Sequence, residues 1–246
     1  MRKSERIYGI RAVIEAINSD KTIDKVYLQK GLKGDLYREL ESIIRKKGVN
    51  ATYVPVERLN RSSKENHQGV IAHISPISFF KLEELVEAAL SSQKLPLFLL
   101  LDQISDVRNF GAIIRTAECT GVNGIIIPKK GAAPITSDTI KTSAGAAFKV
   151  PIAKVDHIKD AIFYLQASGV QVVAATEKTE KSIYEVSFKG PCSIVMGSEG
   201  LGISPSVLKS ADHRAKLPMM GEIGSLNVSV ACGVFLYEAL RQRNSS

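Results

Sequence analysis

The sequence predicts an α/β protein with a parallel sheet covered by helices on both faces and a smaller α/β module before it. In the second part of the chain, continuous apolar runs, typical of strands buried on both faces, alternate with helical segments. The first part also alternates short strands with helices. A chain of 246 residues is long enough for one large or two small domains. We therefore expect a domain at 1–78, a linker at 79–95 and a second domain at 96–246.

The elements of the first module follow from hydrophobic periodicity and turn residues. Helical spacing of apolar residues predicts helices at 10–18 and 36–47, the second ending at Gly48 as its cap. Short apolar runs predict the strands. The remaining segments are, in order, a strand at 26–28, a strand at 51–54, a helical turn at 56–59, a polar loop at 61–68 and a strand at 69–74.

Positive charge is concentrated in this module. Residues 1–78 contain 15 Lys and Arg against 9 Asp and Glu, whereas residues 79–246 contain 18 against 16. Such a surplus indicates an anionic partner, most often nucleic acid, although a solvated basic face would give the same count. A basic loop on a rigid module could contact a phosphate backbone, or it could be an ordinary surface loop. The candidate RNA contacts are Arg58, Arg61, Lys64 and His67, with Gln68 beside them.

The second module begins where the composition changes at Leu95, after a helix at 82–91 and a linker at 91–94. Leu97–Leu101 is a continuous apolar run, as expected of a strand buried on both faces. Because ligands of parallel sheets bind outside the carboxyl ends of the strands, the loops after the strands are the candidate site. Further strands are predicted at 124–127, 170–174, 193–196 and 214–217, and helices at 111–120, 137–144, 157–168 and 205–210.

The loop after the first of these strands offers Asn109 and Arg115. An arginine in the first turns of a helix is unfavourable to the helix dipole, so it is more natural if it reaches an anion or a carboxylate. The structural alternative is an ion pair of Arg115 with Glu118 or Asp102. The residue pattern leaves both interpretations open.

A second candidate loop, at 196–202, contains three glycines, which permit tight turns and close approach of the backbone to a ligand. Their order is G-x-x-G-x-G, which is not the dinucleotide-binding fingerprint. No acidic residue follows about 20 positions on, and no Walker lysine occurs. This argues against a dinucleotide-dependent enzyme. Glu199 in this bend could orient a hydroxyl group or pair with an arginine, or it could be a solvated glutamate in a glycine turn.

The third candidate loop, at 221–227, precedes a final helix in which Ser229 is the only polar side chain before Tyr237. A helix that is apolar nearly all round is expected to be buried. Ser225 or Asn227 could be its N-cap, which is a purely structural role. The three loops together are a stronger indication of a site, since all follow strands of one sheet.

The composition argues against several classes of protein. No run approaches the roughly 18 apolar residues of a membrane span. The N-terminal stretch lacks the unbroken apolar core of a secretory signal. Cys119, Cys192 and Cys232 are far apart in apolar contexts, which predicts buried free thiols and no metal site. We therefore expect a cytoplasmic protein with neither a membrane nor a metal partner.

At the three loops, over about Leu97 to Arg243, the sequence resembles the TrmH family of the SPOUT class of RNA methyltransferases. Residues 1–78 more loosely resemble the substrate-binding domain of its RlmB subgroup, a domain similar to small ribosomal proteins that bind folded RNA. The matching motifs are Asn109-x-Gly111-x-x-x-Arg115-Thr116, Met196-Gly197-Ser198-Glu199-Gly200, Leu217-Pro218-Met219, Ser225-Leu226-Asn227-Val228-Ser229 and, in the first module, His67-Gln68-Gly69-Val70.

The resemblance implies a C-terminal trefoil knot and a homodimer with catalytic sites built across the interface. It also implies that S-adenosylmethionine binds, in a bent conformation, in the knot. Arg115 would face the target ribose. The implied catalytic residues are Arg115, Asn109, Glu199, Ser225 and Asn227, and the implied cofactor-binding residues are Thr176, Gly197, Leu217, Met219 and Leu226.

The implied activity is methyl transfer to a ribose 2′-hydroxyl of structured RNA, and we expect a guanosine of 23S rRNA. A tRNA substrate and a non-catalytic RNA-binding or ribosome-assembly protein of the same fold are the alternatives. Because the pKa of arginine exceeds about 12, Arg115 is interpreted as stabilising the developing alkoxide rather than as a base. Val107 and Phe110 depart from the family pattern but remove no polar group.

Overall fold

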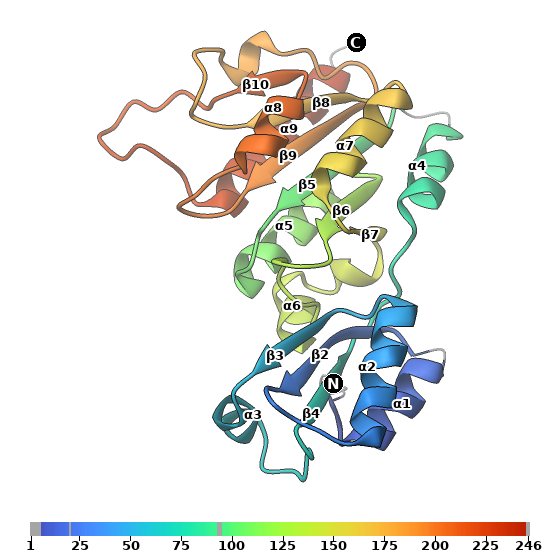
Figure 1. The fold of residues 1–246 in the computed structure, drawn as a ribbon. Helices are drawn as coiled ribbons and strands as arrows, with labels where there is room; N and C mark the ends of the chain where they lie inside the picture. Colours follow the sequence, from blue (N-terminus) through green and yellow to red (C-terminus); the bar gives the residue numbers. More distant parts are fainter. Residues whose placement is uncertain (1–5, 20, 93–94, 245–246) are drawn as a thin grey trace. The chain divides into compact units, whose positions relative to one another are not determined.

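The structure is a computed structural model of the 246-residue chain and describes residues 6–19, 21–92 and 95–244. The chain forms two compact units (Figure 1). One consists of Met1–Ser78 with Pro134–Ser137, and the other of Phe79–Ala133 with Asp138–Ser246. Positions 93 and 94 of the expected linker and the first five residues of the expected first domain lie outside the described residues.

The N-terminal unit is a four-stranded mixed sheet in the order β1-β4-β2-β3. Strands β1 and β2 run antiparallel to β4, whereas β3 runs parallel to β2. Helices α1 and α2 pack on one face around Leu40, and α3 packs on the other through Leu59. The elements are β1 (Arg6–Tyr8), α1 (Ile10–Asn18), β2 (Ile23–Gln29), α2 (Asp35–Lys47), β3 (Ala51–Val54), α3 (Val56–Ser62) and β4 (Val70–Ile74).

The predicted α/β alternation of this unit is confirmed. Helix α1 and strand β3 have their predicted bounds, and Gly48 ends α2 in the left-handed conformation with φ 63°. The sequence does not indicate β1, since three residues are too few to show an alternation. Helix α3 runs on to Ser62 and so includes Arg61, which the sequence places in a loop. Only Leu59 of α3 is buried, so its apolar pattern is too short to indicate the helix end.

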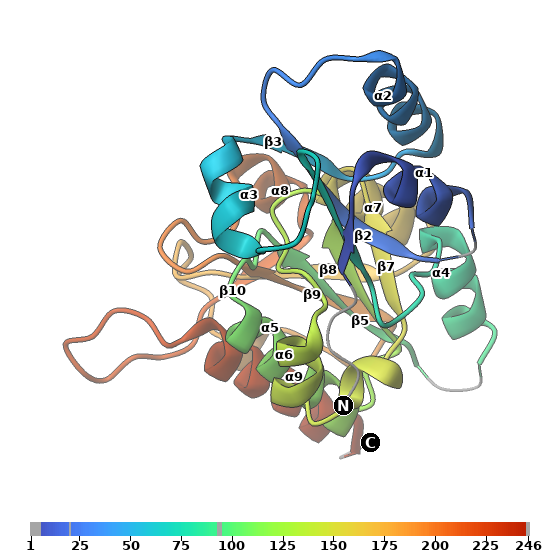
Figure 2. The same ribbon diagram turned by 90° about the horizontal axis from the view of Figure 1, so that it is seen from below.

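The second unit is a six-stranded sheet in the order β10-β8-β9-β5-β6-β7, and all its pairings are parallel. Helices α4, α7 and α8 cover one face, and α5 and α9 cover the other (Figures 1 and 2). The parallel α/β sheet is as predicted. The strands are β5 (Leu97–Asp102), β6 (Gly124–Pro128), β7 (Ile152–Val155), β8 (Gln171–Ala175), β9 (Cys192–Gly197) and β10 (His213–Ala215).

The helices of this unit are α4 (Leu82–Leu90), α5 (Val107–Cys119), α6 (Ser137–Thr142), η1 (Ala146–Phe148), α7 (Ile158–Ala167), η2 (Ile183–Glu185), α8 (Pro205–Ser210) and α9 (Val228–Asn244). Helix α4 lies within the segment expected as a linker. It buries Leu82, Leu85 and Val86 in the core of the sheet. This segment is therefore part of the second unit, because its apolar stripe needs a surface to pack against. None of the helices in the described ranges is long and apolar enough to cross a membrane.

Two predictions of burial are wrong. Helix α9 is buried along one side only, because Val230, Val234 and Tyr237 are 52%, 38% and 55% exposed. These residues are spaced by four and three positions, so they form one apolar stripe on the helix surface. Cys119, at the end of α5, is also exposed, whereas the other two cysteines are buried.

The C-terminal end of α9 is fixed to the sheet by side chains that bind main-chain groups. The side chain of Gln242 accepts a hydrogen bond from the N–H of Phe188 and donates one to the carbonyl of Val186, at 2.9 and 3.0 Å. The guanidinium of Arg243 donates to four carbonyl oxygens at 2.9 to 3.2 Å. Those acceptors belong to Leu95, Pro96, Phe188 and Gly190.

Candidate active site

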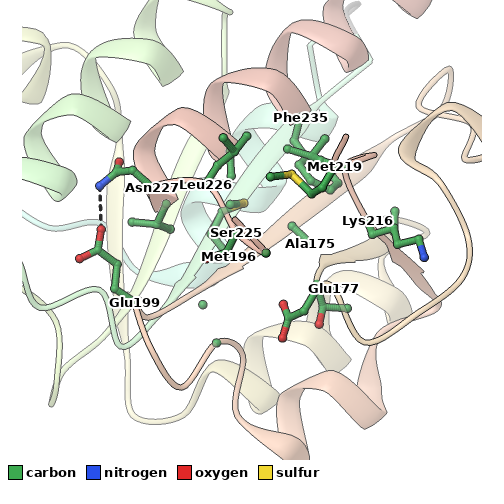
Figure 3. A pocket seen from close by; sticks show the side chains of 18 of the residues that line it. Ala175, Glu177, Met196, Glu199, Lys216, Met219, Ser225, Leu226, Asn227 and Phe235 are labelled. Atoms are coloured by element: carbon green, nitrogen blue, oxygen red, sulfur yellow. Dashed lines mark hydrogen bonds between the residues drawn. The ribbon is translucent and has the colours of Figure 1, made fainter. Parts of the chain in front are cut away.

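Side chains from three loops meet at the carboxyl end of the sheet. The amide Nδ2 of Asn109 donates a hydrogen bond to Oε1 of Glu199 at 2.8 Å. The amide Nδ2 of Asn227 donates to the same carboxylate oxygen at 2.7 Å (Figure 3). It also lies 3.1 Å from Oδ1 of Asn109. We call these three residues the polar cluster. The structure thus brings together three of the five side chains that the sequence singles out as catalytic.

Asn109 is positioned by the start of α5. Oδ1 of Asp106 accepts hydrogen bonds from the N–H groups of Arg108 and Asn109 at 2.9 and 2.8 Å, which makes Asp106 the N-cap. The helix therefore begins four residues earlier than predicted, and Asn109 lies in its first turn. An aspartate just before the apolar periodicity is a signal that could have located this start.

Glu199 lies in a tight glycine turn. The N–H of Ser198 donates to the carbonyl of Gly202 at 3.1 Å, and the N–H of Gly202 donates back to Ser198 at 2.9 Å. A Cβ atom on Gly197 would overlap the main chain of Gly202 and Ile203, so only glycine fits there. The close packing of the two arms of this turn holds Glu199 beside Asn109 and Asn227.

Asn227 is the N-cap of α9. Its Oδ1 accepts hydrogen bonds from the N–H and the hydroxyl of Ser229, at 2.9 and 2.6 Å. Its carbonyl accepts from the N–H of Ala231 at 2.9 Å. The structural and the functional interpretations therefore apply to the same side chain, whose oxygen caps the helix while its nitrogen binds Glu199.

A pocket of about 810 Å³ opens beside the polar cluster. This volume is typical of small-molecule sites, which range over about 300–1,000 Å³. Ala175, Met196 and Phe235 contribute apolar walls (Figure 3). The lining includes all five residues predicted to bind the cofactor, Thr176, Gly197, Leu217, Met219 and Leu226. It also includes three of the residues predicted to be catalytic, Glu199, Ser225 and Asn227.

The pocket also has charged lining residues that the sequence does not single out, Glu177 and Lys216. Nζ of Lys216 donates to Glu180 at 2.8 Å, and this hydrogen bond lowers the pKa of the Glu180 carboxyl. Glu177 lies in a polar, lysine-rich stretch that resembles an ordinary solvated loop, and Lys216 lies in a segment that the sequence predicts as a strand. Within the described residues, no group of three or more His, Cys, Asp and Glu side chains is placed to hold a metal ion.

Arg115 is not at this pocket. It is exposed on α5, and an offset of six residues turns it about 240° around the helix from Asn109. Neither of the ion pairs that the sequence leaves open is formed. Glu118 pairs instead with Lys149 at 3.1 Å, and Asp102 accepts a hydrogen bond from a main-chain N–H at 2.8 Å. Within the chain, Arg115 is thus separate from the other candidate catalytic residues.

The candidate RNA contacts divide into two kinds. Arg58, Arg61 and Lys64 are exposed on or beside α3. His67 is buried, and its Nδ1 accepts a hydrogen bond from the N–H of Gly69 at 3.0 Å. Its Nε2 must then carry the proton and donate to Asn60 at 2.8 Å. Because both ring nitrogens are engaged, the structure gives His67 a role in shaping the loop rather than a free group for RNA.

Known proteins resemble the chain in both of its parts. Residues 96–237 match the family model described as the SpoU rRNA Methylase family. Residues 6–80 match the one described as RNA 2′-O ribose methyltransferase substrate binding. The 23S rRNA (guanosine-2′-O-)-methyltransferase RlmB of Vibrio cholerae is 36% identical over 242 residues, 98% of each chain. RlmB of Pseudomonas aeruginosa is 35% identical over 253 residues, 99% of this chain and 98% of that one.

Solved structures of SpoU enzymes also resemble the chain. The SpoU methyltransferase AviRb from Streptomyces viridochromogenes, in complex with AdoMet, aligns over 98% of this chain and 91% of that chain. Its TM-score is 0.63 at 23% identity, which shows a shared fold. The A. aeolicus TrmH/SpoU tRNA modifying enzyme is 33% identical, with a TM-score of 0.57 over 67% of this chain and 83% of that one. The resemblance found in the motifs is therefore confirmed, and this chain belongs to the SpoU rRNA methylase family.

Proposed function

We propose that the protein transfers a methyl group from S-adenosylmethionine to the ribose 2′-hydroxyl of a guanosine in 23S rRNA. The observation that carries this proposal is the polar cluster at the mouth of a pocket of cofactor size. Relatives matched along nearly the whole chain are named as 23S rRNA (guanosine-2′-O-)-methyltransferases, which supports the substrate. An enzyme acting on this RNA would work in the cytoplasm.

The pocket suits S-adenosylmethionine in size and in charge. Its lining combines apolar residues with two carboxylates, and its one lining lysine is already paired, so no free positive charge opposes a cationic ligand. When bound, the cofactor supplies an activated methyl group on a sulfonium. The residues that would hold it are Thr176, Gly197, Leu217, Met219 and Leu226.

The polar cluster would position the target hydroxyl and assist the loss of its proton. Displacement at a methyl carbon requires alignment of the attacking oxygen with that carbon, which rigid side chains provide. Two amide donors fix Oε1 of Glu199. Its Oε2 carries no hydrogen bond within the described residues and is available to a ribose hydroxyl. Ser225, in the pocket lining, adds a further hydroxyl near this point.

We infer that the active form is a homodimer in which α5 and α9 meet a second copy. The exposed stripe of Val230, Val234 and Tyr237 is an apolar surface that association would cover. Helix α5 packs beside α9, so Arg115 belongs to the same side of the unit. Association would bring Arg115 to the pocket of the other subunit, where its guanidinium would stabilise the negative charge developing on the ribose oxygen.

A trefoil knot at the C-terminus is part of the same proposal. Strand β10 is at the edge of the sheet beside β8, yet α9, which follows it, packs on β9 and α5. The connecting loop, including Leu217–Asn227, must therefore cross the ends of the inner strands. Both this crossing and the membership of the SpoU family support a threaded chain.

We propose that the N-terminal unit binds folded RNA, as do the small ribosomal proteins that it resembles. Its match to a substrate-binding family model supports this role. The contacts would come from Arg58, Arg61 and Lys64, which are exposed together on or beside α3. A tRNA substrate is the second candidate, because a solved structure that aligns over 67% of this chain is named as a tRNA modifying enzyme.

The test is transfer of labelled methyl from S-adenosylmethionine to unmodified 23S rRNA, with bulk tRNA in parallel and Asn227→Ala as the control. Label in 23S rRNA alone, absent with the variant, is the expected result. Label in tRNA alone would contradict the rRNA assignment and keep the chemistry. Absence of both cofactor binding and label would contradict the proposed activity.

A further inference from the structure

The side of the pocket away from the polar cluster holds a second carboxylate. Glu177 and Glu199 both line the pocket and lie on opposite sides of its open space (Figure 3). Glu199 is held by two amide donors. Within the described part of the chain, Glu177 makes neither a hydrogen bond nor an ion pair. The pocket therefore presents one carboxylate that is free to bind a ligand.

The main chain fixes the position of Glu177. Thr176 is buried, and its N–H donates to the carbonyl of Ala215 at 2.9 Å. Its hydroxyl oxygen accepts a hydrogen bond from the N–H of Lys178 at 3.1 Å, which closes a turn with Glu177 at its centre. The main-chain position of Glu177 is thus set by one main-chain and one side-chain hydrogen bond of Thr176, although the side chain of Glu177 is exposed.

No positively charged residue in the lining of the pocket is available to neutralise the carboxylate of Glu177. Lys216 also lines the pocket, but its Nζ binds Glu180 at 2.8 Å and points away from the open space (Figure 3). This side of the pocket therefore attracts hydrogen-bond donors and gives no partner to a ligand carboxylate. The methionine end of the cofactor carries a carboxylate, which this side disfavours, together with an ammonium, which it attracts. The adenosine ribose offers two hydrogen-bond donors and no negative charge.

We propose that Glu177 binds the cofactor by accepting hydrogen bonds from the two hydroxyl groups of the adenosine ribose. The inference rests on the proposed use of S-adenosylmethionine. The sulfonium must face the polar cluster, where the target ribose is methylated. The adenosine ribose is joined to the sulfur by one methylene. Glu177 and Glu199 come from the loops that follow the adjacent strands β8 and β9, so a ligand that fills the pocket between them can reach both. A carboxylate accepts both hydrogen bonds of a vicinal diol.

The test measures binding by isothermal titration calorimetry with the full chain and two ligands. S-Adenosylmethionine is the first ligand. 5′-Methylthioadenosine is the second, because it keeps the ribose diol and adenine but lacks the amino acid and the positive charge. Glu177→Gln is expected to weaken the affinity for both ligands by about tenfold, since a neutral acceptor replaces a charged one. Glu83→Gln is the matched control and is expected to change affinity less than about twofold, because Glu83 is exposed on α4 and does not line the pocket.

The outcomes distinguish a failure of the diol assignment from a failure of the proposed use of S-adenosylmethionine. Weaker binding of S-adenosylmethionine alone would place Glu177 at the ammonium or the sulfonium and overturn the diol assignment. Unchanged binding, or an equal loss in the Glu83 control, would also overturn it while leaving the cofactor assignment intact. If the unmodified protein bound neither ligand, the cofactor assignment itself would fail. Glu177→Asp, which keeps the charge, is expected to bind better than Glu177→Gln, and equal melting temperatures would show that all variants fold.

Discussion

Asn109 and Glu199 are 90 positions apart in the sequence, and a hydrogen bond of 2.8 Å joins the amide of one to the carboxylate of the other. Asn227 binds the same carboxylate oxygen, so one atom of Glu199 connects the first turn of α5, the glycine turn and the start of α9. A carboxylate that accepts two amide hydrogen bonds has lost most of its rotational freedom. The geometry of the polar cluster is therefore largely set before any substrate arrives.

The two roles of Asn227 can be separated by substitution. Asn227→Ala loses both, and is expected to abolish methyl transfer and to lower the free energy of unfolding by about 1 kcal/mol. Asn227→Ser keeps a side chain that caps helices but cannot donate an amide hydrogen bond to Glu199. It should be equally inactive and close to wild type in stability. Urea unfolding and methyl transfer measure the two effects, and an active Asn227→Ser protein would contradict the role in the site.

If each active site contains residues from both subunits of the proposed homodimer, two inactive variants should complement each other. Arg115→Ala and Asn227→Ala homodimers are each expected to be inactive. A mixed dimer would contain one site with Asn227 from one subunit and Arg115 from the other. Mixing equal amounts and allowing exchange should recover up to about a quarter of wild-type activity, since half of the dimers are mixed and one of their two sites is intact. No recovery, with exchange demonstrated, would mean that Arg115 does not act across subunits.

The glycine turn predicts an intolerance at Gly197. An alanine there would place its Cβ in the main chain of Gly202 and Ile203, and we expect a loss of about 1–3 kcal/mol in unfolding free energy together with weakened cofactor binding. Gly190→Ala is the control, because its added Cβ would meet no atom within 4 Å and should change stability by less than about 0.5 kcal/mol. Thermal unfolding and calorimetry check both, and similar behaviour of the two variants would refute the steric argument.

The contacts of Arg243 predict a large effect on stability. Its guanidinium donates to four carbonyl oxygens, so Arg243→Ala is expected to cost about 2 kcal/mol or more. Arg214 is an exposed arginine on β10 without such bonds among the described residues, and Arg214→Ala should change stability by less than about 0.5 kcal/mol. Denaturant titrations of the two variants provide the comparison, in which an equally small loss would show that the Arg243 contacts contribute little.

The stability of the N-terminal unit is expected to depend on pH through His73. Burial lowers the pKa of His73 below its usual 6.5, and the nearby charge of Arg6 adds to the shift. Between the two pKa values the unfolded chain binds the proton more readily, so this contribution is present above pH 6.5 and is lost as the pH falls through the folded-state pKa. His73→Gln should therefore lose less stability than wild type between pH 7.5 and 5.5 in urea titrations. Parallel losses would contradict this assignment.

The sequence predicts the fold of the second unit well where strands are buried on both faces. All residues of β5, β6 and β9 are buried, so each is an apolar run apart from Asp102 and Ser193. It fails at β7, an edge strand, in which only Ile152 and Ala153 are buried. It also fails for α9, because sequence cannot distinguish apolar residues that face the core from those that a second chain would cover.

The sequence indicates which loops form the site, but not how their side chains contact one another. Asn109, Glu199 and Asn227 are each indicated by a loop after a strand or before a helix. Their sharing of one oxygen atom depends on side-chain rotamers, which leave no pattern in the sequence. Glu177 was not indicated at all, because a glutamate in a polar, charged loop resembles any solvated residue.

The exposure of Cys119 makes the protein suited to site-specific labelling. The other two thiols are buried, and burial raises the pKa of Cys232 to about 12, so a thiol-reactive fluorophore at neutral pH would attach to Cys119. Cys119 is four residues after Arg115 and therefore on the same side of α5. A dye at this position would report the environment of Arg115 without any engineered cysteine, and its emission would register the arrival of a second chain or of RNA at that surface.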